Sequence, residues 1–312
     1  MIATRIGLGL LTLVLISILI FGAMGLLPGD VAEAILGQNR TPETVAALRA
    51  QLGLDQPAWA RYLDWIGGML TGDFGKSLAS GRPVADLIGG RLLNTLSLAA
   101  YAALISVPVS IALGVMAALW RGKLADRGIS ISALTAISMP DFFVGYAMIF
   151  IFAVSWRLLP SLAAVPMGAS LGEWLYRATL PALALTLATS AHMLRMTRAS
   201  IVNVLASPYI EMARLKGLRP SRVIIRHALP NALAPIINVV ALNLAFLIVG
   251  VVVIETVFVY PGLGQLLVDS VAARDVPVVQ AACLIFAAAY VSLNLIADVL
   301  AILTNPRLRT AS

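Results

Sequence analysis

Two short motifs in this sequence contain the residue types of known reactive sites, and the first has the outline of a phosphate-binding loop. The stretch LTGDFGKS at 70–77 ends in Gly75, Lys76 and Ser77, whereas a phosphate-binding loop follows the pattern G-x-x-x-x-G-K-[ST]. The first glycine of that pattern is absent, because position 70 is leucine, and no apolar strand precedes the motif. We therefore interpret the motif as a surface turn that carries a solvated lysine.

The second motif, GASLG at 168–172, matches the G-x-S-x-G pattern in which a strained turn exposes a nucleophilic serine. Ser170 would need a base within hydrogen-bond reach. The two histidines, His192 and His227, are expected at the opposite side of a membrane from Ser170. Serine hydrolase chemistry is therefore not predicted, and the motif is interpreted as a Gly/Ser loop.

Metal and redox sites are also not predicted. The sequence has two histidines on different segments, one cysteine (Cys283) within an apolar run, and no H-E-x-x-H motif. A single cysteine cannot form a disulfide framework. We expect no catalytic residues, no bound metal and no cofactor, so the chain itself is not predicted to be an enzyme.

The composition indicates the class of a protein that has no catalytic constellation. Its 312 residues are 60% hydrophobic and 12% charged, and the mean hydropathy is +0.93, whereas soluble proteins carry about 25% charged residues. We predict an all-α polytopic membrane protein. The formal charge of +7 then reflects basic residues held on one side of the bilayer rather than nucleic-acid binding.

Six apolar stretches are long enough to cross a bilayer, which needs about 20 residues. They are 6–27, 95–120, 130–156, 178–198, 232–259 and 279–304. The first is expected to remain as an anchor rather than a cleaved signal peptide, because its uninterrupted apolar length is nearer a full span than a short cleavable core.

Basic residues in the short connections predict the orientation. Thirteen of the 22 lysines and arginines fall on the side that holds the two termini and the segment 199–231, and three fall in the short loops of the other side. By the positive-inside rule, the termini and this segment lie in the cytoplasm. The chain is thus expected to be a multi-pass protein of a bacterial or archaeal cytoplasmic membrane.

The segment 28–94 lies between the first two spans and has turn signals, several aromatics and a helical pattern at 41–52 opened by Thr41-Pro42. It reads as a small folded outer region. We expect two units: residues 1–94, an anchor plus an extracytoplasmic segment, and residues 95–312, a core of five spans.

Three acidic residues fall within or near the predicted spans, where ionisable side chains are costly. Asp141 follows Pro140, so it marks either a helix kink or a solute pathway. Glu255 lies just before Tyr260-Pro261-Gly262, and Asp298 lies two turns before Asn305-Pro306. For both, a structural hydrogen bond and a pathway or gating role remain open.

The most polar stretch, PYIEMARLKGLRPSRVIIRHALP at 208–230, is expected to project into the cytoplasm as two short helices. Ser207-Pro208 is a helix start, Glu211 suits the first turn, and Gly217 is favoured just past a helix end. A second helix can begin at Pro220 and is ended or kinked by Pro230. One use of its basic residues would be to bind anionic lipid.

A more specific reading comes from a resemblance. EMARLKGLRPSRVIIRHALP is similar to the loop signature E-A-A-x-x-x-G-x9-I-x-L-P of permease subunits of binding-protein-dependent ABC importers, in register at Glu211, Ala213, Gly217, Leu229 and Pro230. Met212 and His227 depart from it, in the form familiar from the oligopeptide, dipeptide and nickel class. The stretches at 52–78, 138–145, 255–267, 273–280 and 305–309 also resemble that class, in order.

The resemblance implies a type I ABC importer permease fold with a cytoplasmic coupling helix at 207–217. It further implies that this helix docks on a separate ATPase and transmits ATP-driven closure, as part of a 207–230 loop. The residues expected to carry this coupling are Glu211, Ala213, Arg214, Lys216, Gly217, Arg222, Leu229 and Pro230. The implied partners are a homologous second permease, two ATP-binding subunits or domains, and an extracytoplasmic solute-binding protein.

We expect the solute to be a di- or oligopeptide, with nickel, glutathione, an opine or an oligosaccharide as alternatives within the class. Two other classes of membrane protein fit the sequence less well. A stand-alone secondary transporter would be expected to show paired broken helices and ion-site carboxylates in related halves, and an intramembrane enzyme would need the nucleophile and base excluded above.

Overall fold

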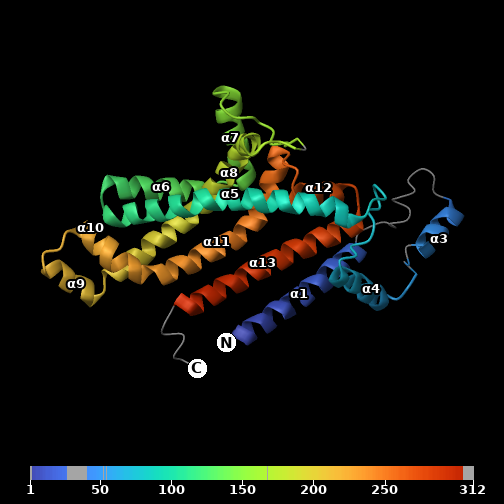
Figure 1. Ribbon diagram of the computed structural model, residues 1–312, viewed down its shortest axis with the longest axis horizontal. Coiled ribbons are helices and arrows are strands. Elements are labelled where there is room, and N and C mark those ends of the chain that lie inside the picture. Colours follow the sequence, from blue (N-terminus) through green and yellow to red (C-terminus); the bar gives the residue numbers. More distant parts are fainter. Residues whose placement is uncertain (1, 27–40, 52, 54, 167, 305–312) are drawn as a thin grey trace.

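The computed structural model describes residues 2–26, 41–51, 53, 55–166 and 168–304, and within these ranges every regular element is a helix. Figure 1 shows their arrangement. The elements are α1 (Ile2–Gly25), α3 (Pro42–Gln51), α4 (Ala58–Thr71), α5 (Val84–Leu119), α6 (Leu124–Ser138), α7 (Asp141–Met148), the π-helix η2 (Ile149–Ser155), α8 (Leu171–Leu205), α9 (Pro208–Leu215), α10 (Pro220–Val223), the π-helix η3 (Ile224–Ala228), α11 (Leu229–Phe258), α12 (Leu263–Ala272) and α13 (Val276–Thr304).

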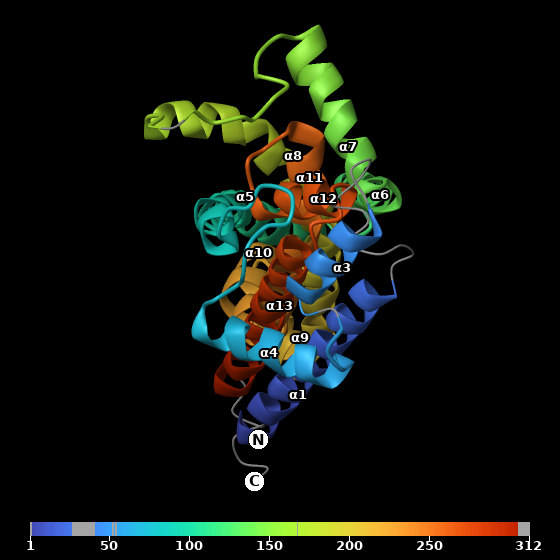
Figure 2. The same cartoon turned by 90° about the vertical axis from the view of Figure 1, so that its right-hand side faces the viewer.

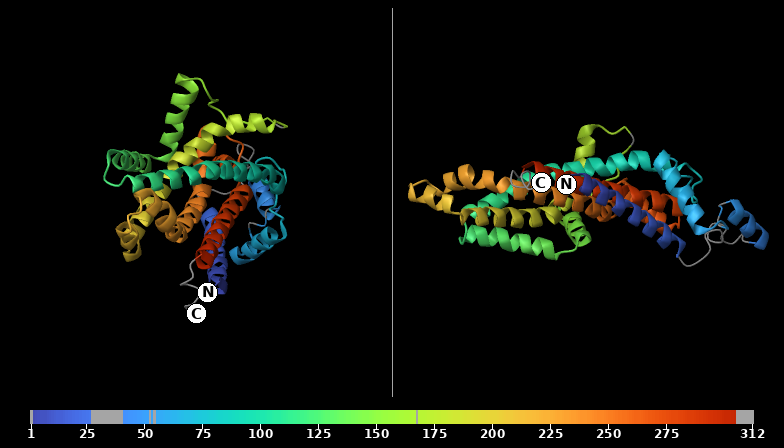
Figure 3. Two further views of the ribbon diagram at one scale, coloured as in Figure 1. Left: turned by 60° about the vertical axis from the view of Figure 1, so that its left-hand side comes forward. Right: turned by 90° about the horizontal axis from the view of Figure 1, so that it is seen from below.

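The long helices form one elongated bundle with two different ends. Contacts run from α5 to α8, from α8 to α11, from α11 to α13 and from α13 to α1. Seen from below, α9 and α10 lie at one end of the bundle and α3 at the other (Figure 3, right). The start of α1 and the end of α13 lie side by side (Figure 1).

Small residues explain why α5 and α8 pack closely. Every fourth residue of α5 from Leu98 to Ala118 is buried, and the four between these two are Ala102, Ser106, Ser110 and Gly114. A Cβ added at Gly114 would lie 2.8 Å from the Thr197 side chain of α8. In lipid, where apolar burial alone gives helices no driving force, such close contact is what holds them together.

The predicted third span, 130–156, is bent rather than straight. α6 and α7 meet at an angle of 108° around Met139 and Pro140. Proline has no N–H to donate and forces the preceding residue into an extended conformation; Met139 accordingly has φ −93° and ψ 133°. α7 therefore leaves the direction of α6 and projects from the bundle (Figure 2).

The six predicted spans are not reproduced as six equivalent helices. Within the described ranges, four helices are long and apolar enough to cross a membrane, and the bent pair adds a fifth if it is one span. α8 covers the predicted 178–198 span and is 35 residues long. Its charged residues, among them Arg195 and Arg198, lower its mean hydropathy, and it is not one of the four.

Part of the segment 28–94 folds back on the bundle through α4. The predicted helix at 41–52 is α3, and the Thr44 amide is 3.3 Å from the Thr41 hydroxyl. α4 returns to α1, where the Tyr62 hydroxyl lies 2.8 Å from Ser17 and the Tyr62 ring packs edge-on against Phe21. These contacts fasten the outer segment to the first span.

Candidate coupling surface

The candidate site begins where α8 turns into α9. Ser207 is the N-cap residue with extended ψ of 147°, and Pro208 is at the first helical position, where its missing N–H costs nothing. The Ser207 hydroxyl does not cap α9 but donates to the Val204 carbonyl at the end of α8. The predicted helix start is therefore confirmed in position, while the serine side chain closes the preceding helix.

Gly217 ends this helix through its backbone conformation. Its φ is +74°, a left-handed conformation that only glycine adopts without a Cβ penalty. The Gly217 amide donates to Arg214 O at 2.9 Å, and the Leu218 amide donates to Ala213 O at 3.4 Å. This pair of bonds is the Schellman arrangement, which satisfies carbonyls that a helix end leaves unpaired.

One face of α9 is packed against the bundle. Ile210 and Ala213 are buried in a cluster with residues of α5, α8, α10, η3 and α11. Leu229, at the start of α11, packs against the same cluster. The Tyr209 hydroxyl donates to His227 O at 3.3 Å, so the short helix is also tied to η3. Of the predicted coupling residues, Ala213 and Leu229 thus form the base of the projection.

The opposite face of α9 is exposed and both charged and apolar. Glu211 lies there with Arg214 and Lys216, and the neighbouring Met212 and Leu215 are 56% and 75% exposed. Arg222 and Pro230 are also exposed. We name the surface formed by Glu211, Met212, Arg214, Leu215 and Lys216 the α9 knob. It offers a partner both charge complementarity and apolar contact.

The second predicted helix differs from the prediction at its end. It begins at Pro220 as expected, but it continues through the π-helix η3 into α11 without a break at Pro230. Proline at 230 cannot donate to the carbonyl of residue 226, and a π-turn relieves that conflict by widening the helix. α10, η3 and α11 therefore form one continuous helical path, which begins after the turn that follows α9.

Glu255 forms several hydrogen bonds at the C-terminal end of α11. Its carboxylate is fully buried and accepts hydrogen bonds from the Thr95 hydroxyl at 2.6 Å, the Gly264 amide at 2.7 Å and the Gln265 amide at 3.2 Å. Two of these donors are in the first turn of α12, so the carboxylate fixes α12 to α5 and α11.

The glycines of the same stretch leave room for this carboxylate. A Cβ on Gly264 would lie 2.8 Å from Glu255 Oε2, and one on Gly262 would collide with the whole carboxyl group. Nearby, the Tyr260 hydroxyl donates to Asn94 O at 3.1 Å. Burial raises the pKa of Tyr260 to about 12, so it remains a donor at neutral pH.

The other two candidate pathway acids lie apart from each other. Asp298 pairs with Arg5 at 2.9 Å on the partly exposed seam of α1 and α13. Asp141 is half-buried at the α6–α7 bend, where a Cβ on Gly250 of α11 would be 3.6 Å from its carboxylate. The structure therefore does not gather Asp141, Glu255 and Asp298 into one site.

The two motifs that resemble reactive sites, LTGDFGKS and GASLG, both form structural contacts. The loop that contains Gly75, Lys76 and Ser77 does bind an anion, but the anion is the carboxylate of Asp275: it accepts from the Ser77 hydroxyl and from the Leu78 amide, the latter at 3.0 Å. The loop thus attaches the outer segment to the turn between α12 and α13.

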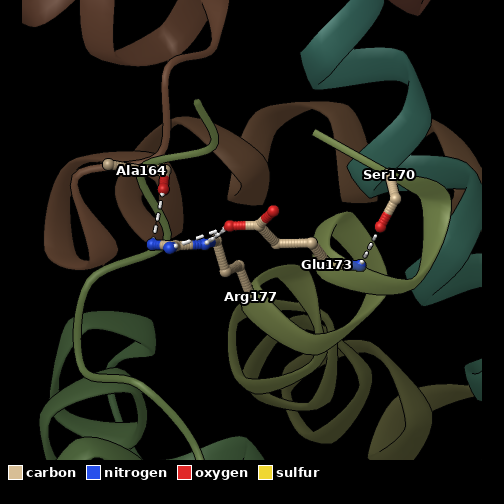
Figure 4. Close-up of polar contacts among 4 residues, drawn as sticks. All are labelled: Ala164, Ser170, Glu173 and Arg177. Carbon is tan, nitrogen blue, oxygen red and sulfur yellow. Dashed lines mark hydrogen bonds and ion pairs between the residues drawn. The ribbon is translucent and has the colours of Figure 1, made fainter. Parts of the chain in front are cut away.

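Ser170 of GASLG is the N-cap of α8. Its hydroxyl accepts the Glu173 amide at 3.2 Å, while Arg177 donates to the Glu173 carboxylate and to Ala164 O, both at 3.0 Å (Figure 4). The serine and the acid three residues later are the two positions of a capping box. Ser170 is thus occupied in holding the start of α8.

Sequence reasoning missed one ion pair next to the α9 end of the bundle. Asp126 of α6 is buried and binds Arg198 of α8 through two bonds of 2.7 and 2.8 Å. It also accepts the Gly122 amide at 2.9 Å. The available signal was an acid at the start of a helix, a common feature that does not indicate its partner.

Comparison with known proteins finds matches over most of the chain. Residues 110–310 match the family described as "Binding-protein-dependent transport system inner membrane component", and residues 1–99 match "Binding-prot-dependent transport system membrane comp, N-term". The glutathione transport system permease protein GsiC of Escherichia coli strain K12 is 40% identical over 298 residues, which cover 96% of this chain and 95% of that protein. GsiC of Salmonella typhi is equally similar.

One solved structure supports the same fold. The MetNI methionine ABC transporter in an inward facing conformation aligns with a TM-score of 0.54 at 17% identity, covering 70% of this chain and 96% of the chain compared. At that identity the likeness is one of fold. The all-helical architecture predicted from the sequence is thereby confirmed.

Proposed function

Because this chain belongs to the family of binding-protein-dependent transport system inner membrane components and is a permease subunit of an ABC importer, we propose that its α9 knob couples a separate ATPase to the transmembrane helices. ATP hydrolysis in such transporters belongs to other subunits, so the permease supplies the path and the mechanical link. The observation that carries the proposal is a rigid, exposed helix fixed at both of its ends.

Rigidity follows from the contacts of α9. The helix is closed at Gly217 by two backbone hydrogen bonds and rests on Ile210 and Ala213. A docked ATPase that pushes on the knob therefore moves α9 as a body, whereas an unstructured loop would absorb the displacement. Glu211, Arg214 and Lys216 supply the charges for docking, and Met212 and Leu215 supply the apolar contact.

The displacement has two routes into the membrane. One leads directly into α8, whose end is bonded to Ser207 and which the Asp126–Arg198 pair fastens to α6. The other leads through α10 and η3, by way of Arg222, into α11 at Leu229 and Pro230. Closure of the ATPases would thus shift α6, α8 and α11 together. This supports alternating access, in which ATP binding opens the path outward and hydrolysis returns it inward.

The two ends of the molecule are proposed to contact different partners. We propose that the end with α3, α4 and α12 faces an extracytoplasmic solute-binding protein, and that the α9 end and both termini lie in the cytoplasm. A second homologous permease and two ATP-binding subunits or domains complete the transporter, with the path between the permeases. In this arrangement, residues 1–94 form the anchor and outer segment, and 95–312 form the core.

A small peptide is the proposed solute. The relatives named above are glutathione permeases, and glutathione is a tripeptide, so the similarity favours this class over nickel, opines or oligosaccharides. Calorimetry on the partner solute-binding protein tests the class: we expect glutathione or di- and tripeptides to bind. Binding of nickel or an oligosaccharide alone would overturn the peptide proposal and leave the coupling proposal standing.

The coupling proposal is tested by Glu211→Lys in the reconstituted transporter. Reversing this exposed charge should reduce solute uptake by roughly tenfold or more, because a like-charge contact at an interface costs several kcal/mol, while ATP hydrolysis continues. Uptake and ATPase activity are measured on the same proteoliposomes.

Two controls accompany that measurement. Arg127→Glu reverses an exposed charge on α6, outside the α9 knob, and should leave both activities unchanged. Glu211→Gln, which removes the charge without reversing it, should give an intermediate loss. Wild-type uptake by a well-expressed Glu211→Lys transporter would show that Glu211 does not take part in coupling.

A further inference from the structure

A cleft between α6 and α8 has the composition of a lipid site. Its volume is about 180 Å³, and its lining residues are Ser130, Ala133, Leu134, Leu194, Arg195 and Arg198. That is close to the size of an engineered cavity of roughly 150 Å³ that holds benzene. The walls are thus apolar, and two arginines and a hydroxyl border them.

The two arginines differ in what neutralises them. Arg198 is paired with Asp126 through two hydrogen bonds, and Asp126 has its other contacts with the Gly122 amide and Ser130. Arg195 has no hydrogen bond or ion pair with any residue that the structure describes. After the Asp126–Arg198 pair is accounted for, the cleft carries one uncompensated positive charge.

Arg195 is exposed on a membrane helix, so it can pair with an anion from outside the chain. Long basic side chains near the ends of such helices reach toward the lipid headgroups. A phosphate accepts two parallel N–H bonds from arginine, which is the geometry that this side chain satisfies best. The nearest source of phosphate at this level is the bilayer itself.

The surroundings favour a lipid phosphate over a free one. From Leu134, the apolar strip on α6 includes Ile131 and Ile137, and all three side chains are exposed, so a hydrocarbon chain can lie along α6 beside the cleft. The turn between α5 and α6 adds the exposed Arg121 and Lys123 at the same end of the bundle. Inorganic phosphate would make no use of the apolar walls.

We propose that the α6–α8 cleft binds an anionic phospholipid, with its phosphate on Arg195 and an acyl chain against Ala133, Leu134 and Leu194. The binding itself does not depend on the proposed coupling. Under the proposed orientation, the cleft lies in the inner leaflet. The bound lipid would fill the gap between α6 and α8, the two helices that the Asp126–Arg198 pair also joins.

The test uses the assembled transporter, purified in neutral detergent and stripped of lipid. Phosphatidylglycerol and phosphatidylcholine of equal chain length are titrated separately, and bound lipid is counted by native mass spectrometry. We expect phosphatidylglycerol to bind more tightly. Arg195→Gln should weaken its binding about fivefold, the factor that corresponds to about 1 kcal/mol per basic residue near a bilayer surface.

Matched variants separate the cleft from general surface charge. Arg127→Gln removes an exposed arginine of α6 that does not line the cleft, and it should retain wild-type affinity. Leu134→Trp fills the cleft without a change of charge and should weaken binding as Arg195→Gln does.

Three results would overturn the proposal. The first is equal affinity for the two lipids, and the second is an equal loss in Arg127→Gln and Arg195→Gln. The third is displacement of the lipid by millimolar inorganic phosphate, which would identify a site for free anions. None of these results bears on whether Glu211→Lys uncouples transport, so the two proposals fail independently.

Discussion

At the scale of single residues, the hydrogen bonds of Glu255 favour the structural one of the two roles that the sequence left open. A gating carboxylate would need access to the path, whereas this one is fully buried and accepts bonds from Thr95, Gly264 and Gln265. The carboxyl group lies at the N-terminal end of α12 and accepts two amides that the helix leaves unpaired. These bonds hold α12 in position.

Glu255→Ala should destabilise the protein by on the order of 3 kcal/mol, because it leaves buried donors without an acceptor. We expect a lower thermal midpoint in detergent and faster hydrogen exchange at the amides of Gly264 and Gln265. The control is Glu173→Ala, whose side chain forms a half-exposed ion pair with Arg177 and should cost less than about 1 kcal/mol. Equal losses in the two variants would contradict the role given to Glu255.

The roles of some residues could be predicted from the sequence and those of others could not. The reason is how far apart the interacting residues lie along the chain. Gly217 was identifiable because its role depends on the helix directly before it. Thr95 lies 160 positions from Glu255, and Asp275 lies 198 positions from Ser77. Such pairs depend on tertiary packing, so the sequence left the role of Glu255 undecided and gave no indication of the Asp275 loop.

At the scale of elements, α9 shows how helix ends determine what a short helix can do. Eight residues are too few to form a stable isolated helix. α9 exists because Ser207 and Pro208 begin it, Gly217 ends it, and Ile210 and Ala213 anchor it. Its use as a mechanical link depends on all of these contacts.

Substitutions at Gly217 should separate conformation from contact. Its position is open, with no atom within 4 Å of an added Cβ, so Gly217→Ala costs only the left-handed strain of about 1–2 kcal/mol. Gly217→Pro also removes the N–H bonded to Arg214 and cannot adopt φ of +74°. Uptake per ATP hydrolysed should fall slightly in the alanine variant and severely in the proline variant.

Gly172→Ala is the control for those two variants. Gly172 lies in the first turn of α8, and an added Cβ there meets only Ser170 Oγ at 3.9 Å, an ordinary contact. It should keep wild-type uptake. Wild-type uptake per ATP in Gly217→Pro would mean that the closed end of α9 is not needed for coupling.

The bend between α6 and α7 marks the limit of element prediction. Pro140 indicated a kink in the third span, but the angle of 108° depends on what α7 packs against. Gly145 makes that packing close, since a Cβ there would lie 3.0 Å from the Val257 side chain of α11. A local signal therefore located the break, and contacts between distant segments determined its direction.

At the scale of the whole molecule, the two ends of the bundle predict opposite exposure to labels. In a Cys283→Ala background, Leu70→Cys on α4 and Leu215→Cys on α9 place a thiol at strongly exposed positions. A membrane-impermeant maleimide should label Leu70→Cys on intact cells and Leu215→Cys only after the membrane is opened.

The cysteine-free background is the control for reaction at other sites. Labelling of Leu215→Cys on intact cells would reverse the proposed orientation, and equal labelling of both thiols before opening would indicate damaged membranes. The basic residues that predicted this orientation include Arg307 and Arg309, which lie outside the described residues. The test therefore does not depend on them.

The arm formed by α7 and η2 has a consequence for how subunits can pair in the bilayer. One side of α7 packs on its own bundle through Val144, Gly145 and Met148. No residue of η2 is fully buried, and Phe150 and Trp156 are exposed. Lipid tails are as apolar as these side chains, so a second subunit that covered the arm would gain close packing rather than hydrophobic free energy.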